Sequence, residues 1–275
     1  MFRREVKPSE RDPEVLIDSK LRDAAYVESF GQEWQSFDGF AGKEVMSHGH
    51  LFGRFALPRD FFSGKTVVDI GCGNGRIGRL IAPLCASYTG ADLSEALYAF
   101  PKYTRRPAKF TLVRASATDL PLDDACSDAT VCWGVLHHVD EPVAAFAELV
   151  RITKPGGVIL LYVYPRALDL RKNLNAFMRG LPLRRGWEII DRLSDDLDEW
   201  REVDPFFANA LSDAVGMSLK HSKPWQKFQW YDGVTPRFHW SLESRIPDLA
   251  GRFGLDSTSY RSGCFTLRRP AQATG

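Results

Sequence analysis

The hydrophobic and polar positions between residues 65 and 165 follow two alternating periods. Short apolar runs rich in valine, isoleucine and leucine alternate with segments whose apolar residues recur at helical spacing. The runs predict strands and the other segments predict helices, in the order TVVDI, RIGRLIAPLC, SYTGADL, SEALYAFPKY, KFTLVRA, DATVCWGV, EPVAAFAELVRIT and GGVILLYVY. This alternation predicts an α/β fold, with helices on both faces of a parallel sheet and right-handed crossovers.

The regular pattern stops after Pro165 and returns near residue 240. Between these points lie helical pieces such as WEIIDRLSDDLDEWREV, and five of the seven tryptophans fall between Trp187 and Trp240. These aromatic residues could form a pocket wall or a small second core. The chain then predicts a helix, SLESRIPDLAGRFG, and an antiparallel hairpin whose strands LDSTSYR and CFTLRR flank a Ser262-Gly263 turn.

These patterns predict four segments. Residues 1–60 are expected to form an N-terminal helical lid segment, of which residues 1–25 are polar and loose and an aromatic stretch surrounds Trp34. Residues 61–165 form the core, residues 166–239 a helical insertion that acts as a substrate lid, and residues 240–275 complete the core.

Composition narrows the functional classes. The chain has 275 residues with 44% apolar content, which is ample for a packed interior. Its 36 Lys and Arg residues nearly balance 35 Asp and Glu residues, for a net charge of +1. This balance favours a small-molecule partner over nucleic acid or an anionic membrane. Nothing in the composition indicates the oligomeric state.

The cysteines and apolar runs indicate a cytoplasmic protein. There are five cysteines, an odd number without C-x-x-C spacing, which is typical of reduced structural thiols. The N-terminus has no apolar signal region, and the longest apolar run, VILLYVY, is too short to cross a bilayer.

The stretch VVDIGCGNGRIG contains two overlapping glycine motifs. Gly73, Gly75 and Gly78 match the dinucleotide fingerprint G-x-G-x-x-G, which would indicate an NAD(P)-dependent oxidoreductase. Two features oppose that interpretation: the strand ends at Ile70, before the fingerprint, and Asp69 would repel a phosphate. Like charges about 4 Å apart cost roughly 1 kcal/mol in water and more in a cleft.

S-adenosylmethionine (SAM) reverses the sign of that interaction, because it carries an ammonium group and a sulfonium but no phosphate. Asp69 then favours the ligand, and the alternating glycines Gly71, Gly73 and Gly75 allow close approach of the backbone. Asp92 ends the next strand, where a carboxylate can accept hydrogen bonds from both ribose hydroxyls.

With these residues in place, the chain resembles the class I SAM-dependent methyltransferases, in particular the small-molecule, type 11-like group with the first motif D-x-G-x-G-x-G. The resemblance covers residues 66–164 and the terminal hairpin. It implies a Rossmann-like, doubly wound, seven-stranded sheet, with SAM as cofactor, S-adenosylhomocysteine (SAH) as product and methyl transfer to oxygen or nitrogen of a small molecule. It places the cofactor against Asp69, Gly71, Cys72, Gly73, Gly75, Asp92, Leu93, Ser116, Ala117, Thr118, Trp133 and Gly134.

One position departs from the family pattern. An acidic residue commonly follows the third strand to hold the adenine amino group, and Ser116 stands there, followed by Ala117. A serine hydroxyl can accept the same hydrogen bond without charge assistance. Asp119 could replace it only if the loop turns it inward, and Trp133 could be a core residue rather than a contact of the methionyl end.

An oxygen nucleophile usually needs a base, and histidine suits that role near neutral pH. His138 follows the fourth strand beside His137, although adjacent histidines there also open helices in this family. Tyr231 and His239 lie in WYDGVTPRFHW, which either borders the acceptor pocket or is a rigid connector. His48 and His50 lack further ligands at metal spacing, so no metal is expected. A methyltransferase-fold protein that binds SAM without turnover remains an alternative.

Overall fold

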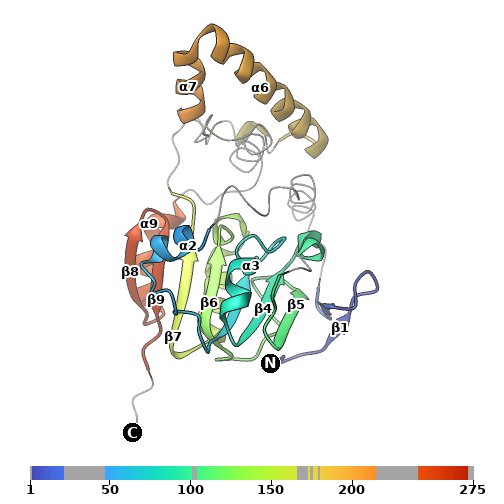
Figure 1. The fold of residues 1–275 in the computed structure, drawn as a ribbon, viewed down its shortest axis with the longest axis vertical. Helices are drawn as coiled ribbons and strands as arrows, with labels where there is room; N and C mark the ends of the chain where they lie inside the picture. Colours follow the sequence, from blue (N-terminus) through green and yellow to red (C-terminus); the bar gives the residue numbers. More distant parts are fainter. Residues whose placement is uncertain are drawn as a thin grey trace. The chain divides into compact units, whose positions relative to one another are not determined.

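The computed structural model describes residues 2–21, 47–100, 104–165, 173, 176–178, 180–214 and 241–271. Two compact units make up the chain, one formed by residues 1–165 with 241–275 and the other by residues 166–240. The first unit contains the sheet, and the second contains the helices α6 and α7 (Figure 1). No helix in these described ranges combines the length and apolarity needed to cross a membrane.

The sheet has nine strands in the order β1-β2-β5-β4-β3-β6-β7-β9-β8. Six neighbouring strands, from β2 to β7 in that order, run parallel, and antiparallel strands flank them on both sides (Figure 1). Their bounds are β1 Val6–Pro8, β2 Val15–Asp18, β3 Thr66–Ile70, β4 Ser87–Asp92, β5 Lys109–Arg114, β6 Ser127–Trp133, β7 Thr153–Tyr162, β8 Asp256–Arg261 and β9 Cys264–Arg268.

Helices cover both faces of this sheet because side chains alternate between its faces along each strand. Residues of α4 and α9 pack on one face, and residues of α2 and α3 pack on the other. The described helices of this unit are α2 His48–Phe55, α3 Gly78–Ile81, α4 Pro142–Ile152 and α9 Leu242–Arg252, with short 3-10 helices η2 Ala82–Leu84, η3 Glu95–Ala99 and η4 Leu136–His138. These two layers hold the carboxyl ends of the parallel strands in place.

The predicted α/β, Rossmann-like, doubly wound fold is confirmed. Its seven expected strands are β3 to β9, and the terminal hairpin turns at Gly263, whose φ is +74°. The seven-strand count is nevertheless too low, because β1 and β2 extend the sheet. Two expected helices are also shorter: RIGRLIAPLC gives the four-residue α3 and then η2, in which Pro83 stands, and SEALYAFPKY gives the 3-10 helix η3.

The prediction that residues 1–25 are loose is wrong for the described part, residues 2–21, which we call the N-terminal arm. Strands β1 and β2 form an antiparallel pair, and β2 pairs in parallel with β5. Val15 and Asp18, the first and last residues of β2, are both buried. The charged residues around these short strands obscure their apolar positions, and the pairing partner lies about a hundred residues away.

The second unit contains α6 Leu183–Val203 and α7 Pro205–Ala214. The predicted helical piece at residues 187–203 lies within α6. Asp204 lies between the two helices and caps the N-terminus of α7. Its carboxylate accepts a hydrogen bond from the Phe207 N–H at 2.9 Å. The Trp200 and Phe207 rings meet edge to face at 5.6 Å between centroids. Trp34, Tyr231 and His239 lie outside the described residues, and the lid roles of residues 1–60 and 166–239 stay predictions.

Candidate functional site

The carboxyl ends of the parallel strands gather the predicted cofactor residues at one edge of the sheet. Residues Gly71 to Gly75 follow β3, Asp92 ends β4, the loop containing Ser116 follows β5, and Trp133 ends β6. The register fixes this alignment, because β3 pairs with both β4 and β6, and Asp92 lies opposite Arg114 of β5. Ligands of open α/β sheets bind at this edge.

The glycine loop after β3 has a backbone that only glycine adopts without strain. Gly71, Gly73 and Gly75 have φ values of +71°, +51° and +82°. A Cβ on Gly71 would lie 2.1 Å from a methyl group of Val135, and one on Gly75 would lie 2.5 Å from the Phe100 ring. The loop is therefore tightly enclosed. Cys72 is buried within it, where its thiol donates to the Gly73 carbonyl at 3.8 Å.

Asp92 is tied directly to the glycine loop. Its Oδ2 accepts a hydrogen bond from the Gly73 N–H at 2.7 Å, while Oδ1 accepts from the N–H and hydroxyl of Ser94 at 2.8 and 2.7 Å. Burial raises the pKa of Asp92, and these hydrogen bonds oppose that rise. Each carboxylate oxygen can accept more than one hydrogen bond, so the half-buried group retains capacity for ribose hydroxyls.

Asp69 lies deeper than the sequence suggests. It is 1% exposed and accepts a hydrogen bond from the Tyr88 hydroxyl at 2.8 Å. Burial raises the pKa of Asp69 to about 7, which the Tyr88 hydrogen bond opposes and the charge of Asp92 reinforces. A Cβ on Gly78 would lie 2.1 Å from the same Tyr88 hydroxyl. Gly78 thus makes room for Tyr88, which explains this glycine without any phosphate.

Asn74 is a candidate that the sequence analysis missed. Its side chain is 1% exposed, yet neither its amide nitrogen nor its amide oxygen has a hydrogen-bond partner among the described residues. A buried amide without partners is costly, and such groups are rare in folded proteins. Asn74 stands inside the glycine loop, so a polar ligand in that loop would satisfy it. Its place between two motif glycines was the available signal.

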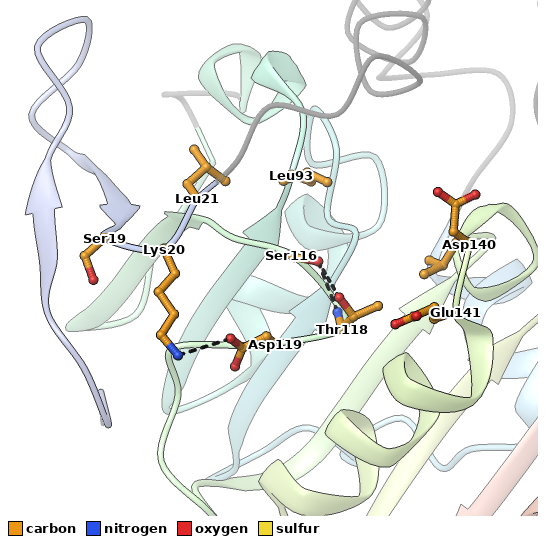
Figure 2. Close-up of a pocket in the computed structure, with 10 residues that line it drawn as sticks. Ser19, Lys20, Leu21, Leu93, Ser116, Thr118, Asp119, Asp140 and Glu141 are labelled. Atoms are coloured by element: carbon orange, nitrogen blue, oxygen red, sulfur yellow. Dashed lines mark hydrogen bonds and ion pairs between the residues drawn. The ribbon is translucent and has the colours of Figure 1, made fainter.

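A cavity of about 840 Å³ opens beside the ends of β4 and β5. It is lined by Ser19, Lys20, Leu21, Leu93, Ser116, Thr118, Asp119, Val139, Asp140 and Glu141 (Figure 2). Three predicted cofactor residues, Leu93, Ser116 and Thr118, therefore share one cavity. The Ser116 and Thr118 hydroxyls are hydrogen bonded to each other at 2.8 Å, whereas Ala117 packs against the core. Ser19, Lys20 and Leu21 belong to the part of the expected lid segment, residues 1–25, that was predicted to be loose.

Asp119 lines this cavity, but its carboxylate is already paired with basic side chains. Its carboxylate forms ion pairs with Arg4 at 2.6 Å, Arg3 at 2.7 Å and Lys20 at 3.6 Å. Partial burial raises the pKa of Asp119, but the Arg4 hydrogen bond and the three positive charges outweigh it and hold the pKa below its ordinary value. Ser116 is therefore the freer of the two candidates for an adenine contact.

Trp133 occupies a core position at the end of β6. Its ring meets Phe55 edge to face at 5.7 Å and lies 4.9 Å from the Tyr162 ring, and the Arg54 guanidinium lies 5.7 Å from its centroid. Gly134 follows with φ +74° and donates its N–H to the Tyr162 carbonyl at 2.9 Å. Packing explains Trp133 by itself, and its contact with the methionyl end stays a prediction.

His137 and His138 are buried in η4, which directly follows β6. Their ring centroids are 4.2 Å apart. The Tyr164 ring lies tilted against His137 at 4.1 Å between centroids, and the Tyr164 backbone N–H donates to the Nδ1 of His137. His48 and His50 instead contact the Leu80 carbonyl and the Ser47 hydroxyl. The described parts of the chain contain no group of three residues that could hold a metal ion.

Comparisons with known proteins agree with this geometry. Residues 68–161 match a family model described as a methyltransferase domain. An uncharacterized methyltransferase of Mycobacterium bovis is 37% identical over 100 residues, which cover 36% of this chain and 39% of that protein. The Mus musculus tRNA (carboxymethyluridine(34)-5-O)-methyltransferase is 29% identical over 163 residues, 58% of this chain and 22% of that protein. The chain thus spans less than half the length of these two relatives.

Among solved structures, the Synechocystis magnesium protoporphyrin IX methyltransferase with bound SAH has a similar fold. The TM-score is 0.50 at 14% identity, and the match covers 88% of this chain and 96% of that one.

Proposed function

Because residues 68–161 form a class I SAM-dependent methyltransferase domain with SAM as its cofactor, we propose that the protein transfers the methyl group of SAM to an oxygen or nitrogen of a small molecule. One observation carries this proposal. The enclosed glycine loop after β3 is hydrogen bonded through Gly73 to Asp92 at the end of β4, so the residues for both halves of the cofactor are held together.

The residues present fit SAM. Asp92 would accept the ribose hydroxyls, and Leu93, Ser116 and Thr118 would enclose the adenine in the cavity of about 840 Å³. The glycine loop and the Asn74 amide would bind the amino-acid end. Asp69 is buried and hydrogen bonded to Tyr88, and its pKa of about 7 leaves the carboxyl only partly ionised at neutral pH. A bound ammonium group would favour the ionised form.

SAM supplies an activated methyl group on a sulfonium that is an excellent leaving group. The protein then has to align the acceptor in line with the methyl group and exclude water, and orientation alone supplies several kcal/mol, up to about 7–11 in well-aligned systems. For an oxygen acceptor, His138 is a candidate base because it is buried at the carboxyl end of β6. Tyr231 and His239 are the other candidates.

The net charge of +1 supports a small-molecule acceptor, because proteins that bind RNA usually carry a basic surface. The named relatives act on different acceptors: one is a tRNA methyltransferase and another a magnesium protoporphyrin IX methyltransferase. We place the walls of the acceptor pocket in residues 166–239 and in the segment around Trp34. A cytoplasmic location, without nucleic-acid or membrane partners, is part of the same proposal.

The proposal is tested with methyl-labelled SAM, the full chain, and two acceptor pools, a small-metabolite extract and total tRNA. We expect label in the metabolite pool together with SAH formation. Label in tRNA alone would replace the small-molecule acceptor with RNA. Cofactor binding without SAH formation in either pool would favour the non-catalytic alternative.

A further inference from the structure

The N-terminal arm contributes one wall of the cofactor cavity. Ser19, Lys20 and Leu21 line it on one side, and Asp140 and Glu141 line it on another (Figure 2). The arm reaches this place because β2 pairs in parallel with β5, directly before the loop that carries Ser116. Residues near the start of the chain therefore help to enclose a site whose motif begins much later, at Asp69.

The arm also forms hydrogen bonds with the loop from Ser116 to Leu122. Phe2 forms a β-bridge with Leu122, and the Arg3 N–H donates to the Pro121 carbonyl at 2.8 Å. The Arg3 side chain donates to the Leu120 carbonyl at 3.0 Å. Glu148 of α4 also contacts the loop, because it accepts a hydrogen bond from the Leu120 N–H at 2.7 Å. The loop is thus held between α4 and the arm.

The Arg4 side chain forms hydrogen bonds both within the arm and with this loop. Its guanidinium donates to both carboxylate oxygens of Asp18, a buried residue of the arm, with Nε at 2.8 Å from Oδ1. It also donates to the Asp119 carboxylate at 2.6 Å and to the Asp119 carbonyl at 2.5 Å. One planar cation therefore makes four hydrogen bonds, two to Asp18 within the arm and two to Asp119 in the loop. Lysine cannot reproduce this geometry.

Asp119, which Arg4 holds, is close in the chain to other residues that line the cavity. The Asp119 N–H donates to the Ser116 carbonyl at 3.3 Å, and Ser116 is paired with Thr118. Ser116 and Thr118 both line the cavity assigned above to adenine. A shift of Asp119 would therefore move the groups that contact the base.

We propose that the N-terminal arm is a working part of the cofactor pocket and that Arg4 is a positioning residue, which fixes the Ser116–Asp119 loop against the adenine half of SAM. The proposal rests on the function proposed above. Arg4 is not among the described residues that line the cavity, and it would act on the cofactor through Asp119.

The test measures affinities of Arg4→Ala for SAH and for 5′-methylthioadenosine, which carries the adenine and ribose but lacks the amino-acid end. We expect both affinities to fall by the same factor, about tenfold, because charged hydrogen bonds that order the loop are lost. Arg4→Lys keeps the charge but not the four hydrogen bonds, so it should fall between wild type and Arg4→Ala.

The matched control is Arg106→Ala. Arg106 pairs with Glu14 at 3.1 Å, so it also ties the arm to the core, but before the start of β5. It should leave both affinities unchanged, and thermal unfolding of each variant shows whether the fold persists.

Wild-type affinity in Arg4→Ala, an equal loss in Arg106→Ala, or a loss confined to SAH would each overturn the positioning role. If Arg4→Ala does not fold, the affinities of Arg4→Lys alone test the proposal. Unchanged affinities in Arg4→Lys would then overturn the positioning role. If the wild type binds neither ligand, the proposed function fails first, and the two failures are thereby distinguished.

Discussion

The sheet unit and the helices of the second unit use similar residues in different ways. In the sheet unit, large apolar side chains such as Tyr88 and Phe146 are fully buried between the strands and the covering helices. At the corner between α6 and α7, Val203 is 85% exposed and Phe206 is 84% exposed. Strand pairing assigns each core side chain to one face of the sheet, whereas these two helices leave large apolar side chains exposed. We expect the sheet unit to bind the cofactor and the second unit to select the acceptor.

The largest expected effect is in the glycine loop. Gly73→Val should reduce SAH affinity more than about 100-fold, because a β-branched residue is strongly disfavoured at φ +51° and its side chain would obstruct the loop. Calorimetric titration measures this loss. Gly251→Ala is the matched control, since a Cβ there meets nothing within 4 Å. Equal affinities in the two variants would remove the glycine loop from the cofactor site.

Asp92→Ala should weaken SAM and SAH alike, by roughly 10- to 100-fold, because a hydrogen-bonded charged group is worth about 1.5–3 kcal/mol. The ribose hydroxyls are common to both ligands and take no part in methyl transfer. Equilibrium binding and steady-state kinetics separate the two effects. A variant with normal affinity but no turnover would assign Asp92 to the acceptor side.

Asp69 should make the stability of the sheet unit depend on pH. The pKa is about 7 in the folded protein and close to 3.9 when unfolded, so the folded state binds more protons between these values. The free energy of unfolding therefore falls as pH rises through this window. Between pH 5.5 and 6.5 we expect Asp69→Asn to remove about 1 kcal/mol of that decrease, as measured by urea unfolding. Identical pH profiles for wild type and variant would show that Asp69 ionises normally.

The smallest effect on the cofactor should come from the segment before α9. Tyr231→Phe and His239→Ala should change SAH affinity by less than about twofold, as expected for sites that are independent of the cofactor pocket. Methyl transfer should nevertheless fall in both. A large loss of SAH affinity would place these residues against the cofactor. It would contradict the assignment of cofactor binding to one region and acceptor selection to the other.

The sequence predicts the sheet from β3 to β9 and the cofactor edge because these features are local. Continuous apolar strands, glycines at fixed spacing and Asp92 at a strand end each show in a few neighbouring residues. The N-terminal arm depends on pairing with β5 and on Arg4, whose partner Asp119 lies 115 residues away. No local pattern reports such contacts.

Burial is the other quantity that the sequence does not report. Asp69 reads as a strand-end carboxylate, but its contact with Tyr88 and its burial depend on how β3, β4 and the glycine loop pack together. The orphaned amide of Asn74 likewise becomes visible only when its surroundings are known.

Isothermal titration of the full chain with SAH, followed by a competition titration with NADH, decides which cofactor the glycine loop accepts. We predict saturable binding of one SAH per chain that NADH does not displace, since Gly78 accommodates Tyr88 and the ionised form of Asp69 disfavours phosphate. Saturation by NADH with no heat from SAH would contradict the SAM assignment and return the chain to the oxidoreductase interpretation.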